Sequence, residues 1–362
     1  MMFNDEELAL IWFDYNDIKF AKVEQILEVF DKISDIFNKN LVKSAIFKNK
    51  LFDEIKNLML EIDYEEFKER VLDEFYKYNI LAVTFASKKY PEKLKNIENP
   101  PLVIYARGDI SLLNKKSISI VGTRKPTTYG KIVTEKFTKE LSSAGLVTVS
   151  GLAYGIDTCV ANATLAAGGK TIAVLAGGLD SIYPSQNKGL ADKIVESGGL
   201  LISENRVTIK PVQYSFIERN RIVSGLGLGT LIVEAGKTSG TMATARHALE
   251  QGRELFVVPG NIYSPESEGT NTLIDEMPDT FTICPERILY RLNIKKKETK
   301  KTEVQVDMIE GDILDVLSNG ELSFDELADK TGLKPSELSA KLIKLEMFGL
   351  VKKGPSNTYY KI

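Results

Sequence analysis

Short turns rich in glycine, hydroxyl and basic residues follow several apolar segments of this chain, and their chemistry suits phosphate. The sharpest is Gly122-Thr123-Arg124, directly after the apolar run Ile118–Val121. Gly122 lets the backbone approach a ligand closely, Thr123 offers a hydroxyl, and the Arg124 guanidinium can hold a phosphate through two hydrogen bonds. We therefore predict an oxyanion site at this turn, completed by the start of the next helix.

A second set of such residues lies further along the chain. Ser239-Gly240-Thr241 opens a predicted helix, and Lys237 precedes it, so this turn forms a second predicted anion site. Arg219-Asn220-Arg221 lies in another predicted helix, where residues two apart point to different sides. One arginine is expected to pair with an internal acid, Glu234 or Glu218, while the other faces a ligand.

Aromatic residues near the turns add a second kind of contact, whereas candidates for acid–base catalysis are few. Tyr154, Tyr183 and Phe216 lie near predicted turns and could stack on nucleic-acid bases. His247 is the single histidine, and it is predicted in the middle of a helix. Asp157 could act as a general base, but its position favours a structural acid at a helix start. We predict no catalytic residue.

Two familiar nucleotide motifs are incomplete. The turn after Ile118–Val121 lacks the second glycine of G-x-G-x-x-G, so it is not a dinucleotide fingerprint. A P-loop would need glycine five residues before each Gly-Lys-Thr string, but Thr164 precedes Gly169-Lys170-Thr171 and Leu231 precedes Gly236-Lys237-Thr238. The sequence therefore predicts neither an ATPase nor a dinucleotide enzyme.

The elements that carry these turns alternate between strand and helix. Short runs rich in Val, Ile and Leu are typical of strands buried on both faces of a parallel sheet. The alternation predicts an α/β fold with an extended Rossmann-like, doubly wound, mostly parallel sheet. The expected strands are Ile118–Val121, Leu146–Val149, Thr171–Leu175, Leu200–Ser203, Thr230–Val233, Leu255–Val258 and Phe281–Cys284, with Leu102–Ala106 as an edge strand.

Different patterns flank this region and suggest four segments. Residues 1–75 show helical spacing and predict a small helical, SAM-like domain, and residues 76–292 form the Rossmann-like domain. Residues 293–304 are a charged linker. Residues 305–362 show three helical segments and a hairpin, the pattern of a winged helix. This module could bind DNA or protein.

Composition narrows the function classes. The 362 residues carry a net charge of −3, so a polyanion site must be a local cluster. Two cysteines and one histidine give neither a disulfide scaffold nor a usual zinc site, and we predict no metal and no cofactor. No apolar run is long enough for a membrane span, and we expect a cytoplasmic protein without a membrane partner.

Together these residues resemble the bacterial DNA-processing protein A family, also called DprA or Smf. The similarity spans roughly residues 75–290 and agrees in both order and spacing. The matching strings are Val121–Arg124, Ser150–Asp157, Gly169–Leu175, Ile182–Pro184, Arg219–Leu226, Ser239–Thr241 with Thr244–Arg246, Gly252-Arg253, Val258–Gly260 and Gly269–Asn271 with Leu273-Ile274.

The resemblance implies a homodimer that binds single-stranded DNA without sequence preference, in natural transformation. It further implies protection of incoming strands, loading of the recombinase RecA and no enzymatic activity. With the turns above, the expected DNA-binding residues are Gly122, Thr123, Arg124, Ser150, Gly151, Lys170, Arg219, Asn220, Arg221, Lys237, Ser239, Gly240 and Thr241.

The chain departs from the family at three places. Ala161 stands where the family has histidine, Met277-Pro278 replaces a Gly-Ala pair, and Phe13–Ile18 lacks the glycine of a helix-hairpin-helix. DNA binding by the N-terminal domain is therefore not expected.

Two other functions fit parts of the pattern. A nucleotide phosphoribohydrolase of the lysine-decarboxylase-like class would share the fold, but Thr244 stands where its Pro-Gly-Gly-x-Gly-Thr-x-x-Glu motif needs glutamate. A winged-helix regulator with a sensor domain would instead prefer particular duplex sequences.

Overall fold

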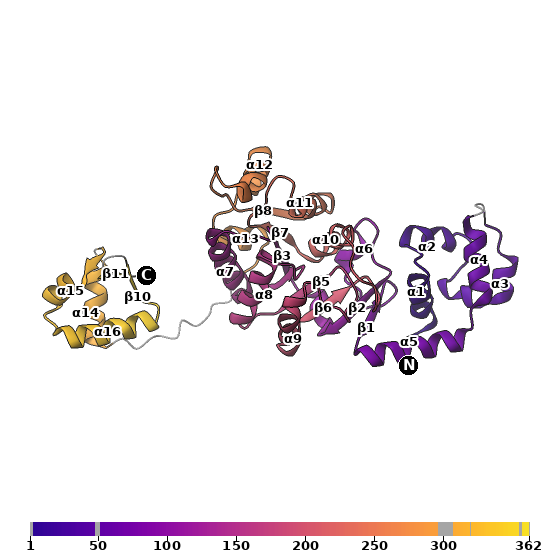
Figure 1. Cartoon of the computed structure of the whole chain (residues 1–362), viewed down its shortest axis with the longest axis horizontal. Helices are drawn as coiled ribbons and strands as arrows, with labels where there is room; N and C mark the ends of the chain where they lie inside the picture. Colours follow the sequence, from indigo (N-terminus) through magenta and orange to yellow (C-terminus); the bar gives the residue numbers. More distant parts are fainter. Residues whose placement is uncertain (1–2, 48–50, 296–306, 319, 355–356, 362) are drawn as a thin grey trace. The chain divides into compact units, whose positions relative to one another are not determined.

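The protein divides into two compact units, Met1–Lys297 and Glu298–Ile362, which are described separately below (Figure 1). The computed structural model describes all residues except 1–2, 48–50, 296–306, 319, 355–356 and 362. Most of the predicted linker, residues 296–304, and two residues of the C-terminal hairpin turn therefore lie outside the described residues. None of the described helices combines the length and apolar character that crossing a bilayer requires.

An eight-stranded sheet forms the centre of the first unit. Its order is β1-β2-β6-β5-β4-β3-β7-β8, and the strands from β6 to β8 run parallel, while β1 and β2 are antiparallel additions. This confirms the predicted α/β class with a mostly parallel sheet. The strands are β1 Leu81–Thr84, β2 Val103–Gly108, β3 Ser117–Val121, β4 Val147–Ser150, β5 Thr171–Leu175, β6 Leu200–Ser203, β7 Gly229–Ile232 and β8 Glu254–Val257.

Two strand predictions were wrong. The run Leu102–Ala106 is not an edge strand, because β2 lies between β6 and the unpredicted β1. The run Phe281–Cys284 makes only a single parallel bridge, between Phe281 and Val257. It is followed at once by Pro285, which starts a short helix, and so it cannot extend along β8.

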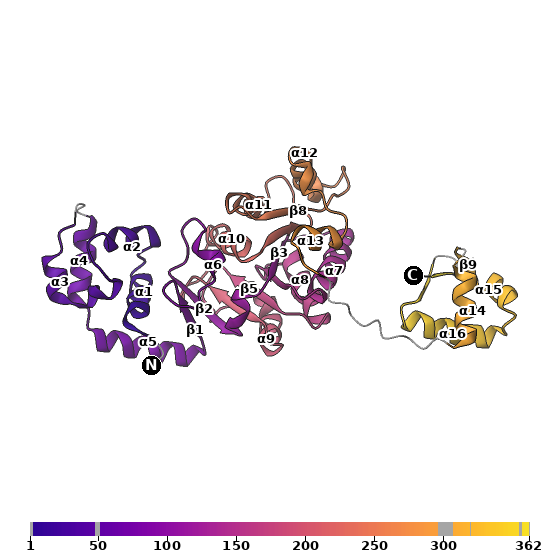
Figure 2. The same cartoon turned by 180° about the vertical axis from the view of Figure 1, so that it is seen from behind.

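Helices cover both faces of the sheet, as a doubly wound fold requires. One face packs against α7, α8, α9 and α13, and the other against α6, α10, α11 and α12. α9 lies near β6 (Figure 1), and α12 lies near β8 in both views (Figures 1 and 2). The helices are α6 Glu92–Lys95, α7 Thr128–Ser143, α8 Ile156–Ala166, α9 Lys188–Glu196, α10 Ser215–Leu226, α11 Gly240–Glu250, α12 Glu268–Glu276 and α13 Pro285–Arg291, with 3-10 turns η2 Ile110–Asn114, η3 Ser185–Asn187, η4 Pro265–Ser267 and η5 Pro278–Thr280.

The N-terminal segment is helical and shares a hydrophobic core with the sheet. The Asp14 carboxylate accepts a hydrogen bond of 2.6 Å from the Tyr105 hydroxyl on β2, and Arg206 donates to the Tyr15 carbonyl at 2.7 Å. Burial raises the pKa of Asp14 to about 6. The elements are α1 Asp5–Tyr15, α2 Phe20–Leu27, η1 Ile33–Phe37, α3 Lys39–Ser44, α4 Leu51–Glu61 and α5 Tyr64–Tyr78.

The strand order places one ligand-binding crevice in the sheet. From β3 the chain proceeds to β4, β5 and β6 on one side, and β7 and β8 lie on the other. The crevice of such a sheet opens at the carboxyl ends of the two strands where the order reverses, here β3 and β7.

The second unit is a winged helix. A small core of its own holds α14, α15 and α16 against a three-stranded sheet of order β10-β11-β9. Lys341 and Lys344 on α16 both pair with Glu310, a fully buried residue of α14, at 3.3 and 2.7 Å. The elements are α14 Met308–Leu317, β9 Leu322–Ser323, α15 Phe324–Thr331, α16 Pro335–Met347, β10 Val351–Lys353 and β11 Thr358–Lys361.

Candidate nucleic-acid interface

A cleft of about 1070 Å³ opens at the carboxyl ends of β3 and β7. The turn after β3, the first half of α10 and the start of α11 form its walls. These segments are far apart in the sequence, and the sheet topology brings them together. Of the predicted DNA-binding residues, those that line the cleft are Gly122, Thr123, Arg124, Arg219, Asn220, Lys237, Ser239, Gly240 and Thr241.

Four exposed cations line this cleft: Arg124, Lys125, Lys237 and Arg246. Within the described part of the chain, none of the four forms an ion pair. The acid among the lining residues, Asp157, is buried beneath them. The cleft is therefore locally positive although the whole chain is weakly acidic, and its charges are free to meet anionic ligand groups.

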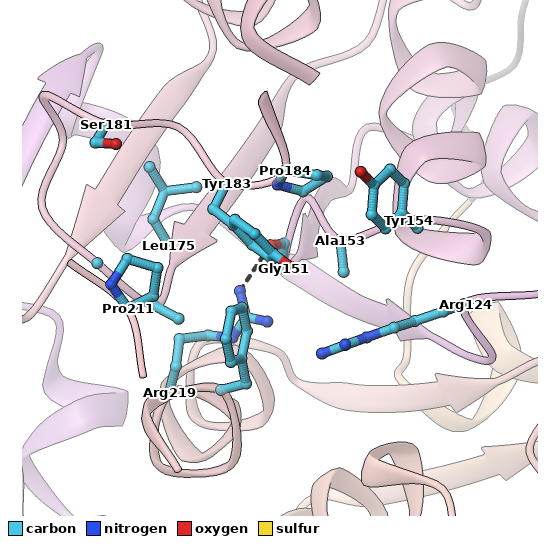
Figure 3. Close-up of a pocket in the computed structure, with 13 residues that line it drawn as sticks. Arg124, Gly151, Ala153, Tyr154, Leu175, Ser181, Tyr183, Pro184, Pro211 and Arg219 are labelled. Atoms are coloured by element: carbon cyan, nitrogen blue, oxygen red, sulfur yellow. Dashed lines mark hydrogen bonds between the residues drawn. The ribbon is translucent and has the colours of Figure 1, made fainter. Parts of the chain in front are cut away.

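Two aromatic rings stand beside the cations. The ring centroids of Tyr183 and Phe216 are 5.4 Å apart, with their planes inclined at 59°. The Arg124 guanidinium carbon lies 5.2 Å from the centre of the Phe216 ring, a cation–π distance. Arg124 and Tyr183 face the same hollow in Figure 3, and Tyr154 lies beside it with its hydroxyl bonded to Gln186. Of the three predicted aromatic residues, Tyr183 and Phe216 line the cleft.

The backbone of the turn after β3 forms hydrogen bonds within the protein, whereas we predicted that it would take part in an oxyanion site. The Thr123 N–H donates to the Glu234 carbonyl at 2.7 Å, and the Thr123 carbonyl accepts from Ile156 N–H at 3.1 Å. A Cβ on Gly122 would lie 2.6 Å from an Ile156 side-chain carbon, so glycine is required there by packing. Backbone bonds therefore hold the turn in place, and Arg124 is the residue of this turn whose exposed side chain lines the cleft.

The start of α11 forms the opposite wall. Ser239 is the N-cap residue, and its hydroxyl accepts from Thr241 N–H at 3.2 Å. Asn220 on α10 donates to the Gly240 carbonyl at 3.3 Å and so joins the two helices. A Cβ on Gly240 would meet no atom within 4 Å, which leaves the backbone here open to the solvent side of the cleft. The positive end of α11 thus faces the same space as Lys237.

Arg219 supports the cleft floor from inside the protein. Its side chain is 5% exposed and donates to the Gly151 carbonyl at 2.7 Å and to the Val174 carbonyl (Figure 3). Burial lowers the pKa of Arg219 to about 10. A Cβ on Gly151 would overlap the Arg219 guanidinium, so this glycine makes room for the arginine. Arg219 thus joins the carboxyl ends of β4 and β5 through hydrogen bonds.

Four predicted residues do not line the cleft. Arg221 forms a two-bonded ion pair with Glu204 at 2.6 and 3.2 Å, so the internal acid is neither Glu234 nor Glu218. Ser150 is buried and donates to the Ile120 carbonyl, and Gly151 lies beneath Arg219. Lys170 directly precedes β5 and bonds the Ser197 carbonyl, which places it at the opposite, amino edge of the sheet.

The lining residues that the sequence prediction did not include are several, among them Lys125, Gln213 and Arg246. Lys125 directly follows Arg124 and could have been included from its position alone. Arg246 lies four residues after Met242, so a helical count from the start of α11 places both on one face. Gln213 precedes α10, and no sequence signal marks it.

No carboxylate or imidazole of the described residues is exposed in the cleft. Asp157 accepts hydrogen bonds from the N–H groups of Gly151 and Ala153 at 3.0 and 3.2 Å, and burial raises its pKa. This agrees with the predicted structural role at the start of α8. His247 lies outside the cleft lining, 3.3 Å from the Glu250 carboxylate. Among the described residues, no group of three His, Cys, Asp or Glu side chains could hold a metal ion.

Two family models match the sequence. Residues 81–293 match the model described as DNA recombination-mediator protein A, and residues 297–357 match the DprA winged helix domain. The first match alone covers more than half of the chain, including every wall of the cleft.

Individual proteins similar to this chain point to the same family. The chain is 42% identical over 255 residues to the DNA processing protein DprA of Bacillus subtilis, covering 67% of this chain and 86% of that protein. The X-ray structure of DNA processing protein A from Streptococcus pneumoniae matches with a TM-score of 0.62 and 30% identity, over 80% of this chain and 93% of that one. A Helicobacter pylori structure, titled for the single-stranded DNA binding mode of its DNA processing protein A, matches with a TM-score of 0.53 and 32% identity, over 59% and 95%.

Proposed function

The chain belongs to the DNA recombination-mediator protein A family, and we propose that it binds single-stranded DNA in the cleft between β3 and α11 without converting it. The observation that carries this proposal is the set of four exposed cations, none of which forms an ion pair within the described chain, beside the exposed Tyr183 ring and the half-buried Phe216 ring. Phosphates of a polynucleotide would meet Arg124, Lys125, Lys237 and Arg246, and these contacts carry no base information.

The aromatic pair favours unpaired over paired strands. Base stacking on an aromatic side chain contributes about 1–3 kcal/mol per base and requires a base face that a duplex keeps covered. Tyr183 and Phe216 are the rings in position to provide such a surface, and Arg124 against Phe216 ties the phosphate and base contacts together.

The wider role follows from the family. In this proposal the protein covers incoming single strands during natural transformation, hands them to the recombinase RecA and acts as a homodimer. The single-stranded DNA binding mode for which the Helicobacter pylori structure is named supports DNA as the ligand. In the part of the chain that the structure describes, no exposed carboxylate or imidazole lines the cleft, which supports a binding protein over a phosphoribohydrolase.

Fluorescence anisotropy with a labelled oligothymidylate tests the cleft directly. Four phosphate contacts predict that log K falls with log salt with a slope of about −3. Arg124→Ala should weaken binding about tenfold for all sequences and reduce the slope by about 0.7, because one phosphate contact and the packing on Phe216 are lost.

Lys170→Ala is the matched control. It removes one exposed cation of the same domain from the opposite edge of the sheet, and it should leave affinity and slope unchanged. Equal affinity for duplex and single strand, or equal losses in the two variants, would contradict the proposal. Release of a free base from nucleoside monophosphates would show instead that the protein is a phosphoribohydrolase.

A further inference from the structure

The start of α7 is the place where a doubly wound fold ordinarily holds a ligand phosphate. α7 follows β3, the first strand at the point where the strand order reverses, and in folds of this kind the N-terminal N–H groups and dipole of that helix face the crevice. In this protein a side chain of the protein itself already lies there.

That side chain is Glu234, the second residue after β7. Its carboxylate accepts hydrogen bonds from the Thr127 hydroxyl at 2.5 Å and from the Thr127 N–H at 3.0 Å, and Thr127 is the N-cap of α7. The Thr127 hydroxyl in turn accepts from Gly130 N–H at 3.1 Å. Two backbone donors of this helix start, the N–H groups of Thr127 and Gly130, are therefore engaged by an internal anion and by the cap that binds it.

The surroundings are shaped for this carboxylate. Glu234 is 1% exposed, and within the described chain it has no cationic partner, so backbone, hydroxyl and helix dipole balance its charge. A Cβ on Gly130 would overlap the carboxylate, so Gly130 leaves the necessary space. Its backbone also receives Thr123 N–H, which couples the residue to the cleft turn.

We infer that Glu234 is a specificity residue: its carboxylate fills the phosphate position of the fold and so excludes the terminal phosphate of a free nucleotide. The cleft is then left with phosphate contacts on its outer rim only, at Arg124, Lys125, Lys237 and Arg246. One or two such exposed contacts hold a mononucleotide weakly, whereas a polynucleotide engages all of them together. This inference rests on the proposed function and explains how the site prefers a chain over its monomers.

Three full-length proteins test it: the wild type, Glu234→Ala and Glu234→Gln. Calorimetric titration with thymidine monophosphate at physiological salt should show binding to Glu234→Ala at least about tenfold tighter than to the wild type, since a phosphate can then use the free helix start. Glu234→Gln keeps the volume and should exclude the nucleotide as the wild type does. Adding Thr127→Val to Glu234→Ala should abolish the gain.

Glu234→Ala should be less stable than the wild type because it leaves buried donors unpaired, so thermal unfolding provides a second measurement. Inorganic phosphate should raise the Tm of Glu234→Ala more than that of the wild type, at an ionic strength matched with chloride. Equal nucleotide affinity in the wild type and Glu234→Ala, together with equal phosphate shifts, would overturn the inference.

Oligothymidylate binding by the same proteins separates the two proposals. If all three bind the oligonucleotide but Glu234→Ala does not gain nucleotide binding, Glu234 has no role in selection while the cleft proposal stands. If Glu234→Ala gains the nucleotide but no protein binds the oligonucleotide, the proposed function fails and the role of Glu234 as an occluding anion stands.

Discussion

Replacing Arg219 by alanine should damage the fold of the first unit far more than the chemistry of the cleft. Arg219 is 5% exposed, and it donates to the carbonyls of Gly151 and Val174, at the ends of two neighbouring strands. Its removal leaves two buried carbonyls without these donors and takes away a guanidinium whose charge stabilises the buried Asp157 carboxylate, which opposes the rise in the Asp157 pKa caused by burial.

The magnitude follows from opposing terms. Each buried carbonyl left unpaired costs about 1–3 kcal/mol, and losing the packed stem adds about 1–2 kcal/mol. Burial lowers the pKa of Arg219 from 12.5 to about 10, so removing the buried charge returns about 3 kcal/mol. The midpoints of these ranges leave a net loss of about 2–3 kcal/mol in the free energy of unfolding.

Urea unfolding followed by tryptophan fluorescence measures this loss. The single tryptophan, Trp12, is buried in the core that the N-terminal helices share with the sheet, so it reports on the first unit. Under native conditions the folded Arg219→Ala protein should bind oligothymidylate within about threefold of the wild type, in contrast to Arg124→Ala. Arg219→Ala with unchanged stability and lost DNA binding would show that Arg219 faces the ligand, and the reasoning from burial would be wrong.

Two further predictions concern charges outside the cleft. The pKa of Asp14 is raised from 3.8 to about 6, so the contribution of Asp14 to stability is complete below pH 4 and is lost as pH rises through 6. Compared with Asp14→Asn, whose side chain can still accept from Tyr105, the wild type should lose about 2–3 kcal/mol of stability between pH 4 and pH 7. Urea unfolding measures this loss, and a difference between the two proteins that stays constant with pH would refute it. Glu310→Gln should lower the midpoint of the C-terminal thermal transition in calorimetry of the full chain, because Lys341 and Lys344 lose their shared buried partner, and an unchanged midpoint would contradict that role.

The sequence by itself determined the class of fold and the edge of the sheet at which the proposed site lies. Short runs rich in Val, Ile and Leu, such as Thr171–Leu175, are typical of central strands, and the turns at their carboxyl ends lie on one edge of a parallel sheet. This local logic identified Arg124, Lys237 and the start of α11 without any knowledge of the strand order.

The tertiary structure decided which polar groups face the ligand and which face the protein. Arg219 and Arg221 are two residues apart and chemically identical, yet one bonds strand ends and the other Glu204, since these partners come from distant segments. Lys170 and Lys237 each lie in a Gly-Lys-Thr string, but Lys170 enters a strand and Lys237 follows one, so they lie at opposite edges. The sequence alone could not place Glu234 either. Only the strand order brings it to the start of α7, where we infer that its charge replaces that of a phosphate.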